Sequence, residues 1–320
     1  MSEQRANPPA SASGAGLALL AYGIFATHDA VIKSLGGSYS VFQIVFVAVL
    51  FAFVPVMLML LLDRAPANLI PRHPWLVAAR TLTMMSSMAF AFFAFTLLPL
   101  AETYALLFAT PLLITVLSVP MLGETVRLRR WIAVFAGLIG VLVILRPGYT
   151  EFTAGHASAL LAAAGSAISG ILARKIGGEE RSAVLILYPM LGNILVMGCA
   201  LPWVYVPMPL DDFGLMASVG LLSTLAQLCV IGAFRAAPAA LVAPFQYSQI
   251  IWAVPFGYFF FNDIPDIWVA AGTSIIVGSG LFVVWRENRA EVSETRPVLR
   301  IRNMRPDAGP QFRPQSDEPQ

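Results

Sequence analysis

Three ionisable side chains stand close together in an apolar segment near the start of the chain. They are His28, Asp29 and Lys33, and the residues around them, from about 15 to 35, are mainly apolar or small. An ionisable group inside a bilayer is costly unless it pairs with another group or faces water. The types and spacing of these three residues therefore limit what the segment can do.

Two interpretations of this group stay open. Asp29 and Lys33 are four residues apart, so on a helix they share a face and can form a neutral pair, with Lys33 extending to the membrane interface. Alternatively, His28 and Asp29 line a site that binds a substrate or a proton. Histidine titrates near neutral pH, and loss of water favours the protonated form of a carboxyl group.

A second group of polar side chains lies in a later apolar segment, at about 238–261. Gln246 and Gln249 are three residues apart and share a helix face, and Tyr247 and Trp252 belong to the same segment. Amides in lipid can bond neighbouring helices together. Two amides beside two aromatic rings also suit the wall of a pocket for a planar or zwitterionic solute. The predicted substrate-binding residues are His28, Asp29, Tyr104, Asn193, Gln246, Tyr247, Gln249 and Trp252.

A further set of residues is predicted to couple or gate: Asp29, Lys33, Glu102, Pro111 and Pro244. Glu102 opens an apolar helix, where the helix dipole favours a carboxylate, so capping is the first interpretation and a gate the alternative. The prolines each remove a backbone hydrogen bond and permit a kink.

Three other charged residues are expected at the ends of apolar segments. Arg80, near the start of the third segment, is predicted to lie at the membrane interface. Glu124 and Asp263 each follow an apolar segment, and we expect them to hold loops rather than to contact a solute.

Several kinds of chemistry have no matching pattern in the sequence. No GxxxxGK[ST] phosphate-binding loop and no HExxH metal motif occurs, and Cys199 and Cys229 have no metal-ligand spacing. His73 and His156 are single histidines expected at opposite membrane faces, which disfavours a catalytic cluster. We therefore predict no catalytic residues, no metal and no cofactor, and a protein that is not an enzyme.

The composition predicts an all-α polytopic membrane protein. Hydrophobic residues make up 58% of the 320 residues and charged residues only 12%, whereas a soluble domain is about 25% charged. A helical span needs about 20 apolar residues. Ten apolar runs are long enough for helices, at about 15–35, 40–62, 75–97, 101–122, 131–146, 156–176, 182–205, 213–235, 238–261 and 267–285.

These runs divide the chain into two five-helix units, 15–146 and 156–285, joined by a loop at 147–155. Residues 1–14 and 286–320 are polar and rich in small residues, proline or arginine, and are predicted to be disordered tails, the second one cytoplasmic.

The positive charges predict the orientation. If the amino terminus is cytoplasmic, 18 of the 20 Lys and Arg residues fall on that side, and only Lys33 and Arg146 lie near the other. Positive residues collect on the cytoplasmic side of bacterial membrane proteins. We therefore predict an inner-membrane protein with both termini in the cytoplasm and an even number of crossings.

Two stretches of sequence are alike. Residues 98–124 and 237–263 each contain a proline turn, an apolar helix and a closing carboxylate. The separation between Pro99 and Pro238 equals the separation between Glu124 and Asp263, and we call it the repeat spacing. Because each unit has five helices, an odd number, the second unit is expected to be inverted. Inverted repeats with a site near the membrane midplane are typical of transporters.

These motifs resemble the EamA-type family of the drug/metabolite transporter superfamily. The resemblance covers about 15–285 and rests on Arg80, the PLAE turn at 99–102, Pro111, Gly123-Glu124 and the repeated pattern at 237–263. In the second copy Asn262-Asp263 replaces the usual Gly-Glu. The resemblance implies ten helices in two inverted repeats and the transport of amino acids, drugs, riboflavin or S-adenosylmethionine.

The expected function is therefore secondary transport of a small organic metabolite by alternating access, with export slightly favoured. The alternatives are import of a planar vitamin such as riboflavin or of S-adenosylmethionine, and, in another class, a membrane assembly partner or lipid-handling protein that transports nothing. The expected partners are a small-molecule substrate and the lipid bilayer, without nucleic acid. A homodimer and proton coupling are both left open.

Overall fold

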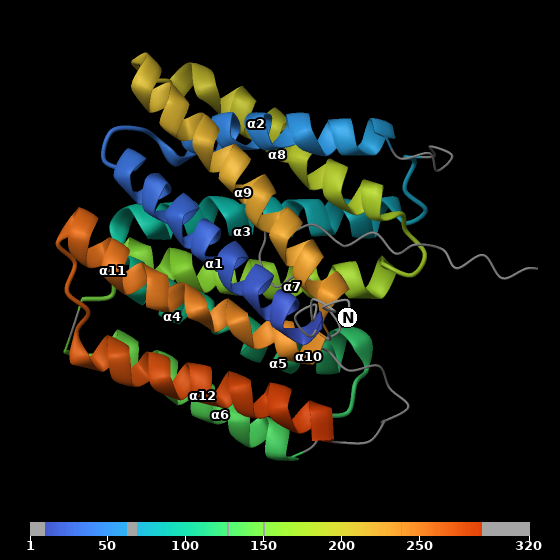
Figure 1. The fold of residues 1–320 in the computed structure, drawn as a ribbon, viewed down its shortest axis with the longest axis vertical. Helices are drawn as coiled ribbons and strands as arrows, with labels where there is room; N and C mark the ends of the chain where they lie inside the picture. Colours follow the sequence, from blue (N-terminus) through green and yellow to red (C-terminus); the bar gives the residue numbers. More distant parts are fainter. Residues whose placement is uncertain (1–9, 63–68, 127, 150, 238, 290–320) are drawn as a thin grey trace, which may run out of the picture.

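The computed structural model describes residues 10–62, 69–126, 128–149, 151–237 and 239–289, and every regular element within these ranges is helical (Figure 1). Most of the two expected tails, including all residues beyond 289, lies outside these ranges. Helices extend into both, because the first begins at Ala10 and the last ends at Arg289.

The helices follow the same order in the two halves. The first half has α1 (Ala10–Leu35), α2 (Val41–Leu62), α3 (Pro74–Leu97), α4 (Leu100–Leu107), α5 (Thr110–Leu122) and α6 (Leu128–Leu145). The second half has α7 (Ala154–Ile176), α8 (Ser182–Val204), α9 (Leu210–Ala236), α10 (Ala239–Val242), the 3-10 helix η1 (Ala243–Ser248), α11 (Gln249–Phe261) and α12 (Ile267–Arg289).

Seven segments of the described chain are long and apolar enough to cross a membrane: α1, α2, α3, α4 with α5, α7, α8 and α9. Two shorter apolar helices span 130–145 and 267–282. The outer faces carry exposed large apolar side chains such as Leu58, Leu82 and Leu195. A helix surface of this kind suits contact with lipid tails.

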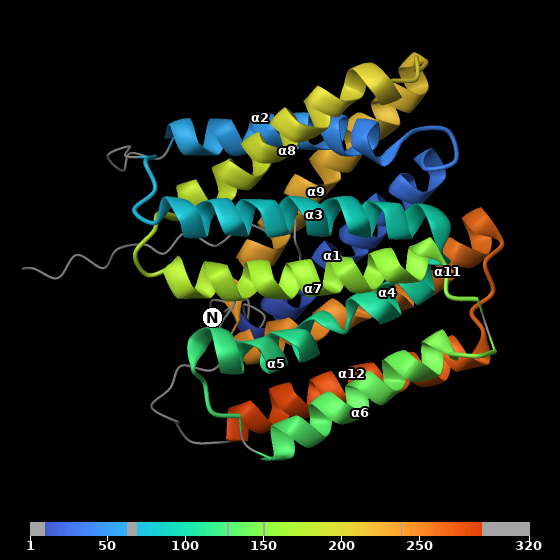
Figure 2. The ribbon, with the colours of Figure 1, turned by 180° about the vertical axis from the view of Figure 1, so that it is seen from behind.

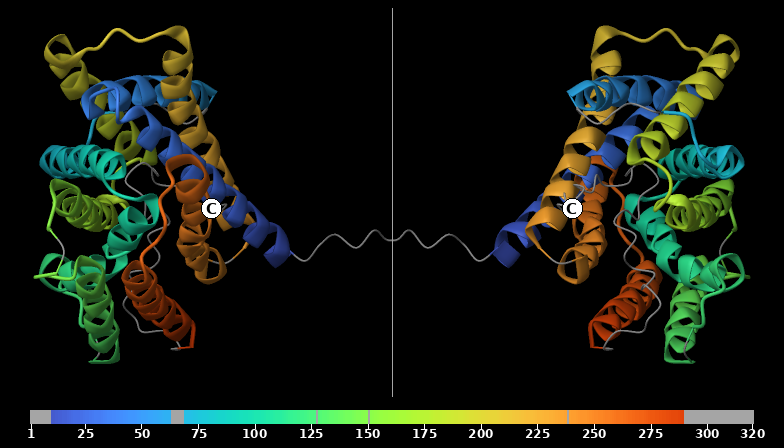
Figure 3. Two further views of the ribbon diagram at one scale, coloured as in Figure 1. Left: turned by 90° about the vertical axis from the view of Figure 1, so that its left-hand side faces the viewer. Right: turned by 90° about the vertical axis from the view of Figure 1, so that its right-hand side faces the viewer.

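Helices of one half pack on helices of the other. The most extensive contacts join α1 to α9, α3 to α7 and α6 to α12. Viewed end-on, α3, α5, α7 and α6 stand together on one side and α1, α9, α11 and α12 on the other (Figure 3). Seen from behind, α2 and α8 lie at one edge of the molecule and the α6–α12 pair at the opposite edge (Figure 2). Each side of the fold thus mixes elements from both halves.

The α6–α12 pair depends on two facing glycines. A Cβ atom added to Gly272 would lie 2.6 Å from the carbonyl oxygen of Gly140, and one added to Gly140 would lie 2.7 Å from that of Gly272. A side chain at either position would meet backbone, which cannot move aside cheaply. Small residues commonly permit such close helix approach in membranes.

Gly272→Val is therefore expected to destabilise the protein by about 1–3 kcal/mol, the usual cost of overpacking, seen as a lower melting temperature in detergent. Gly278→Val is the matched control, because Gly278 lies on the same helix and a Cβ there meets nothing within 4 Å. Equal losses for the two variants would contradict this account of the pair.

Candidate functional site

A cavity lies between the second and third helices of each half. It encloses about 120 Å³ and is lined by α2, α3, α8 and α9. Its wall is mainly apolar and includes four methionines, Met59, Met84, Met88 and Met190. Methionine is flexible and polarisable, so such a wall can adapt to apolar groups of different shape. We call this space the inter-repeat cavity.

The cavity lies between equivalent positions of the two halves. Met84 on α3 and Ser223 on α9 both line it and are separated by the repeat spacing, and so are Met88 and Gln227. This spacing is the one that relates Pro99 to Pro238 in the sequence. Equivalent faces of α3 and α9 therefore meet at one space.

Few polar groups reach this cavity. Its described lining contains Asn193, Ser223, Thr224 and Gln227 and no acidic or basic residue. The Asn193 side chain is 3% exposed, and its Nδ2 donates to the carbonyl oxygen of Pro189 at 3.0 Å. Its Oδ1 is buried and has no hydrogen-bond partner within the described chain. A buried acceptor without a donor is costly, so Asn193 is suited to contact a solute.

Both predicted proline hinges lie at breaks in helices. The helix expected at 101–122 is divided into α4 and α5, and Thr110 Oγ1 donates at 2.7 Å to the carbonyl oxygen of Leu107. Pro111, four residues after Leu107, has no N–H to supply that bond. The helix expected at 238–261 is likewise interrupted by η1, which contains Pro244.

The two breaks meet. Phe108 at the first break and Tyr247 within the second are related by the repeat spacing, and their rings contact edge to face with centroids 5.0 Å apart. Equivalent residues of two repeats can touch only where they approach the axis that relates them. The contact therefore marks the centre of the repeated structure.

His28, Asp29 and Tyr104 form one buried cluster, which we call the Asp29 cluster. Asp29 is 0% exposed; its Oδ1 lies 2.7 Å from His28 Nδ1, and its Oδ2 accepts a hydrogen bond from the Tyr104 hydroxyl of α4. Phe92 packs edge-on against the His28 ring. The cluster thus joins α1 to α4, two helices of the first half.

The side chain of Lys33 does not form the pair with Asp29 that the spacing of the two residues allowed. Its Nζ donates to the carbonyl oxygen of Leu98 at 2.7 Å and lies 3.3 Å from Asp263 Oδ2. The expectation of an Asp29–Lys33 pair took account of one helix alone, whereas α11 brings an acid to the same face. Asp263 does hold its loop to another element, as expected.

Glu124, which the repeat spacing relates to Asp263, makes the equivalent ion pair between the two halves. It pairs with Arg174 of α7, as Asp263 pairs with Lys33 of α1. The residues before the two acids, Gly123 and Asn262, both end their helices in the left-handed conformation, with φ of 68° and 56°. Asparagine is one of the few residues other than glycine that adopt this conformation readily, so the replacement at Asn262 preserves the helix end.

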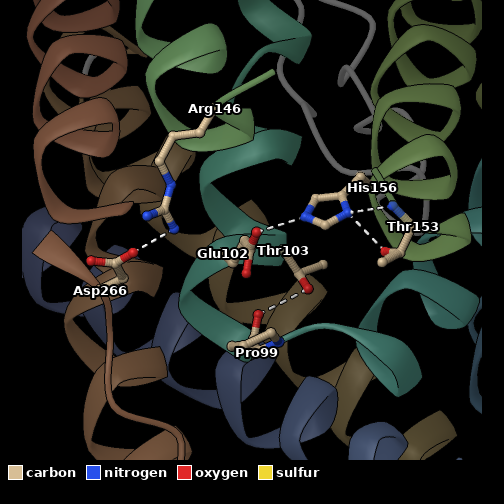
Figure 4. Close-up of polar contacts among 7 residues, drawn as sticks. All are labelled: Pro99, Glu102, Thr103, Arg146, Thr153, His156 and Asp266. Carbon is tan, nitrogen blue, oxygen red and sulfur yellow. Dashed lines mark hydrogen bonds and ion pairs between the residues drawn. The ribbon is translucent and has the colours of Figure 1, made fainter. Parts of the chain in front are cut away.

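Glu102 binds a histidine (Figure 4). His156 Nδ1 accepts from the Thr153 backbone N–H at 3.0 Å, so its Nε2, 2.8 Å from Glu102 Oε1, is the donor to that carboxylate. Glu102 lies in the first turn of α4, where the helix dipole favours a carboxylate, but the N-cap residue of that helix is Pro99.

A second cavity, of about 90 Å³, lies beside Glu102. Its charged lining consists of Glu102, Arg146, Asp263 and Asp266, and Arg146 pairs with Asp266 across it (Figure 4). We call it the polar end pocket. It lies at the start of α4 and the end of α11.

Polar contacts also join the turn between α1 and α2 to the region between α8 and the start of α9. Tyr39 donates to Asp212 at 2.5 Å, and this hydrogen bond, with burial, raises the pKa of Tyr39 to about 12. The buried Gln43 side chain bonds both the N–H and the carbonyl oxygen of Val206, at 2.9 and 2.8 Å. Sequence reasoning gave no role to Gln43, because a single amide in an apolar run carries no sign of its partner.

The predicted substrate-binding residues are thus not all in one place. Asn193 lines the inter-repeat cavity, and His28, Asp29 and Tyr104 form the Asp29 cluster. Gln246 and Gln249 are buried near Tyr247, at 7% and 2% exposed. Trp252 is 37% exposed and lies against α1, where a Cβ added to Gly23 would be 3.2 Å from its ring. Sequence reasoning did not identify the methionines of the cavity. The repeat spacing could have pointed to two of them, because it relates Met84 to Ser223 and Met88 to Gln227.

Comparison with known proteins decides the family. The EamA-like transporter family matches residues 12–146 and 153–285, once for each half of the chain. The chain belongs to the EamA-like transporter family. It is a multi-pass membrane protein and a small-molecule transporter, which confirms the family resemblance and the prediction of a transporter rather than an enzyme.

Named relatives of this EamA protein act on different solutes. It is 24% identical over 277 residues to an S-adenosylmethionine uptake transporter of Rickettsia bellii, covering 87% of this chain and 95% of that one. It is 25% identical over 270 residues to the pseudopaline exporter CntI of Pseudomonas aeruginosa, covering 83% and 93%. A riboflavin transporter of Vibrio cholerae is 28% identical over 195 residues, covering 60% and 64%.

A solved crystal structure shares the fold. It superposes with a TM-score of 0.59 at 19% identity, covering 88% of this chain and 99% of that chain. The fold of this EamA protein is therefore one that has been observed by experiment.

Proposed function

We propose that this protein is a secondary transporter that carries a small organic solute across the bacterial inner membrane by alternating access. The inter-repeat cavity carries the proposal: equivalent faces of α3 and α9 line it, and so does Asn193, whose buried Oδ1 has no hydrogen-bond partner within the described residues. A site between repeats can be reached from either side as the two groups of helices rock. Its methionines and amides suit a solute with an apolar or aromatic body and a few hydrogen-bonding groups.

The proposal includes ten crossings in two inverted repeats with both termini in the cytoplasm. Support comes from the equal helix order of the halves, the two matching breaks and the reciprocal packing of α1 on α9 and α3 on α7. Arg5, Arg64 and the arginines beyond 289 count toward this orientation but lie outside the described residues. Reporter tags fused to the two ends should both be cytoplasmic, and a periplasmic tag would contradict it.

Asn193→Leu is expected to raise KM for the transported solute about tenfold, with little change in expression. Leucine has nearly the same volume but cannot accept a hydrogen bond, and one lost bond to a bound polar group is about 1.4 kcal/mol. The measurement is flux into vesicles that contain the purified protein. Leu195→Val is the control, because Leu195 lies two residues away and is 68% exposed on the lipid side.

The direction of transport is proposed as export, with import as the alternative. Relatives include both an uptake transporter and an exporter, so metabolite profiling of deletion and overexpressing cells is the test. Export predicts solute accumulating outside the overexpressing cells. Rescue of an auxotroph for riboflavin or S-adenosylmethionine would favour import instead, and absence of any flux in vesicles would favour the non-transporting class.

We also propose that transport is coupled to protons through Asp29. Its carboxylate is fully buried and is held by His28 and by the Tyr104 hydroxyl. Two charged residues lie between it and the polar end pocket. Asp263 lines that pocket and pairs with Lys33, which is one helical turn from Asp29. A proton taken up by Asp29 would weaken its acceptor bonds to His28 and Tyr104 and so loosen α1 from α4.

A further inference from the structure

Arg80 is buried, although the sequence predicted it at the membrane interface. Its side chain is 4% exposed and is directed from α3 to α8, where NH1 donates to the carbonyl oxygen of Leu185 at 2.5 Å. The side chain therefore extends into the protein and not toward the membrane interface. A buried basic side chain is costly, so its presence requires an explanation.

One reason is local. Leu185 is four residues before Pro189, which has no N–H, so the carbonyl of Leu185 lacks its normal helical donor. Arg80 supplies that donor. A neutral amide could also donate a hydrogen bond to this carbonyl. The hydrogen bond therefore explains why residue 80 is a donor, but not why it is positively charged.

The charge itself has no compensating acid among the described residues. No carboxylate pairs with Arg80 in the described part of the chain, and its Nε is buried without a hydrogen-bond partner. A buried unpaired charge is strongly unfavourable unless something compensates it. The position that the repeat spacing relates to Arg80 in the second half holds Val219, which is 0% exposed. The repeated fold therefore accepts an apolar side chain at this place.

Arg80 does not itself line the inter-repeat cavity, but residues one turn away from it do. Met84, one turn along α3, lines the cavity, and so do Ile186 and Pro189, which lie on α8 beside and one turn beyond the carbonyl that Arg80 binds. The described cavity wall itself holds no charged residue. A positive charge thus lies one helical turn from residues that line an uncharged, largely apolar space.

We propose that Arg80 recognises an oxyanion group on the transported solute, such as a carboxylate. The planar guanidinium can donate two parallel hydrogen bonds to a carboxylate or a phosphate. The solute would then be a small organic acid, with its apolar body against the methionines and its anionic group toward Arg80. This inference rests on the proposed transport function and adds the charge of its substrate.

The test compares an acid with its amide. Binding of 4-phenylbutyrate, 4-phenylbutyramide and phenyl phosphate to the full-length protein is measured by calorimetry in phospholipid-free detergent. We expect wild-type protein to bind one or both anions about tenfold or more tightly than the amide. Arg80→Gln keeps a donor for the Leu185 carbonyl and should lose this preference, while Arg80→Lys should keep part of it.

Pro189→Ala restores the missing N–H and provides the structural control. In the double variant Pro189→Ala/Arg80→Gln the carbonyl of Leu185 is satisfied by its own helix, so loss of anion preference there reports the charge alone. Equal binding of acid and amide, no binding of either, or a preference that persists in Arg80→Gln would each overturn the proposal. Because binding is measured without flux, these results leave the transport proposal to its own vesicle test.

Discussion

Asp29→Asn is expected to abolish transport driven by a proton gradient, while exchange of labelled solute between the two sides, without a gradient, continues near the wild-type rate. Asparagine has the shape of aspartate and keeps a carbonyl acceptor, so the Tyr104 contact can persist. It cannot take up and release a proton near neutral pH. The two assays therefore separate coupling from solute binding.

The groups around Asp29 explain why this residue is proposed to couple transport to protons. His28 contacts it from the same helix and Tyr104 from α4, while Lys33 and its partner Asp263, just after α11, lie one turn toward the polar end pocket. A carboxylate held by two polar neighbours in an apolar interior can exchange its proton only when a path to water opens. Opening and protonation are thereby linked.

The measurements are made in vesicles with a pH jump and with equal internal and external solute. Thr27→Val is the control on α1, since Thr27 is exposed and its hydroxyl donates to the Gly23 carbonyl of its own helix. If Asp29→Asn lost both gradient-driven transport and solute exchange, Asp29 would have a structural role and no specific role in coupling. Unchanged gradient-driven transport would remove it from coupling altogether.

The sequence was sufficient to predict the helices, but not which side chains of different helices contact one another. Apolar runs of about 20 residues and the internal repeat predicted the helices and their order, because both depend on local composition. The Asp29–Lys33 pair, one of the two interpretations left open, is not the one observed for Lys33, because the i, i+4 rule describes one isolated helix. The observed partners, Tyr104 and Asp263, come from α4 and the end of α11, distant in sequence.

The candidate site shows the same limit. Asn193 and the Gln246–Gln249 group were all predicted to bind the substrate, yet only Asn193 lines the inter-repeat cavity, because packing between the halves sets which helix faces meet. Arg80 was misplaced for a related reason. The missing N–H of Pro189 draws it to α8, and no pattern within α3 reveals a need that arises on another helix.

Exchanging the charges of Lys33 and Asp263 is expected to restore stability that either single reversal removes. Lys33→Glu places an acid beside Asp263, and Asp263→Lys places a base beside Lys33. Each leaves a partly buried charge facing its like, at a cost of roughly 1–3 kcal/mol. The double variant Lys33→Glu/Asp263→Lys re-forms an ion pair and should recover more than half of that loss.

This pair matters because of where it sits. Lys33 belongs to α1 of the first half and Asp263 follows α11 of the second, and Glu124 with Arg174 forms the matching link from α5 to α7. Each link fastens the first helix of one half to the end of a broken helix in the other. The two links thereby hold together the mixed groups of helices that alternating access must move as units.

Melting temperature in detergent measures the effect, and the Arg146–Asp266 pair supplies the comparison. That pair lies at the same end of the molecule but is more exposed, at 27% and 39% of the two side chains against 12% and 23% for Lys33 and Asp263. Exposed ion pairs contribute about 0–1 kcal/mol, so reversing Asp266 should cost less than reversing Asp263. If the double exchange were as unstable as the two single changes combined, the contact between α1 and α11 would depend on packing alone, and the charges would have no part in fastening it.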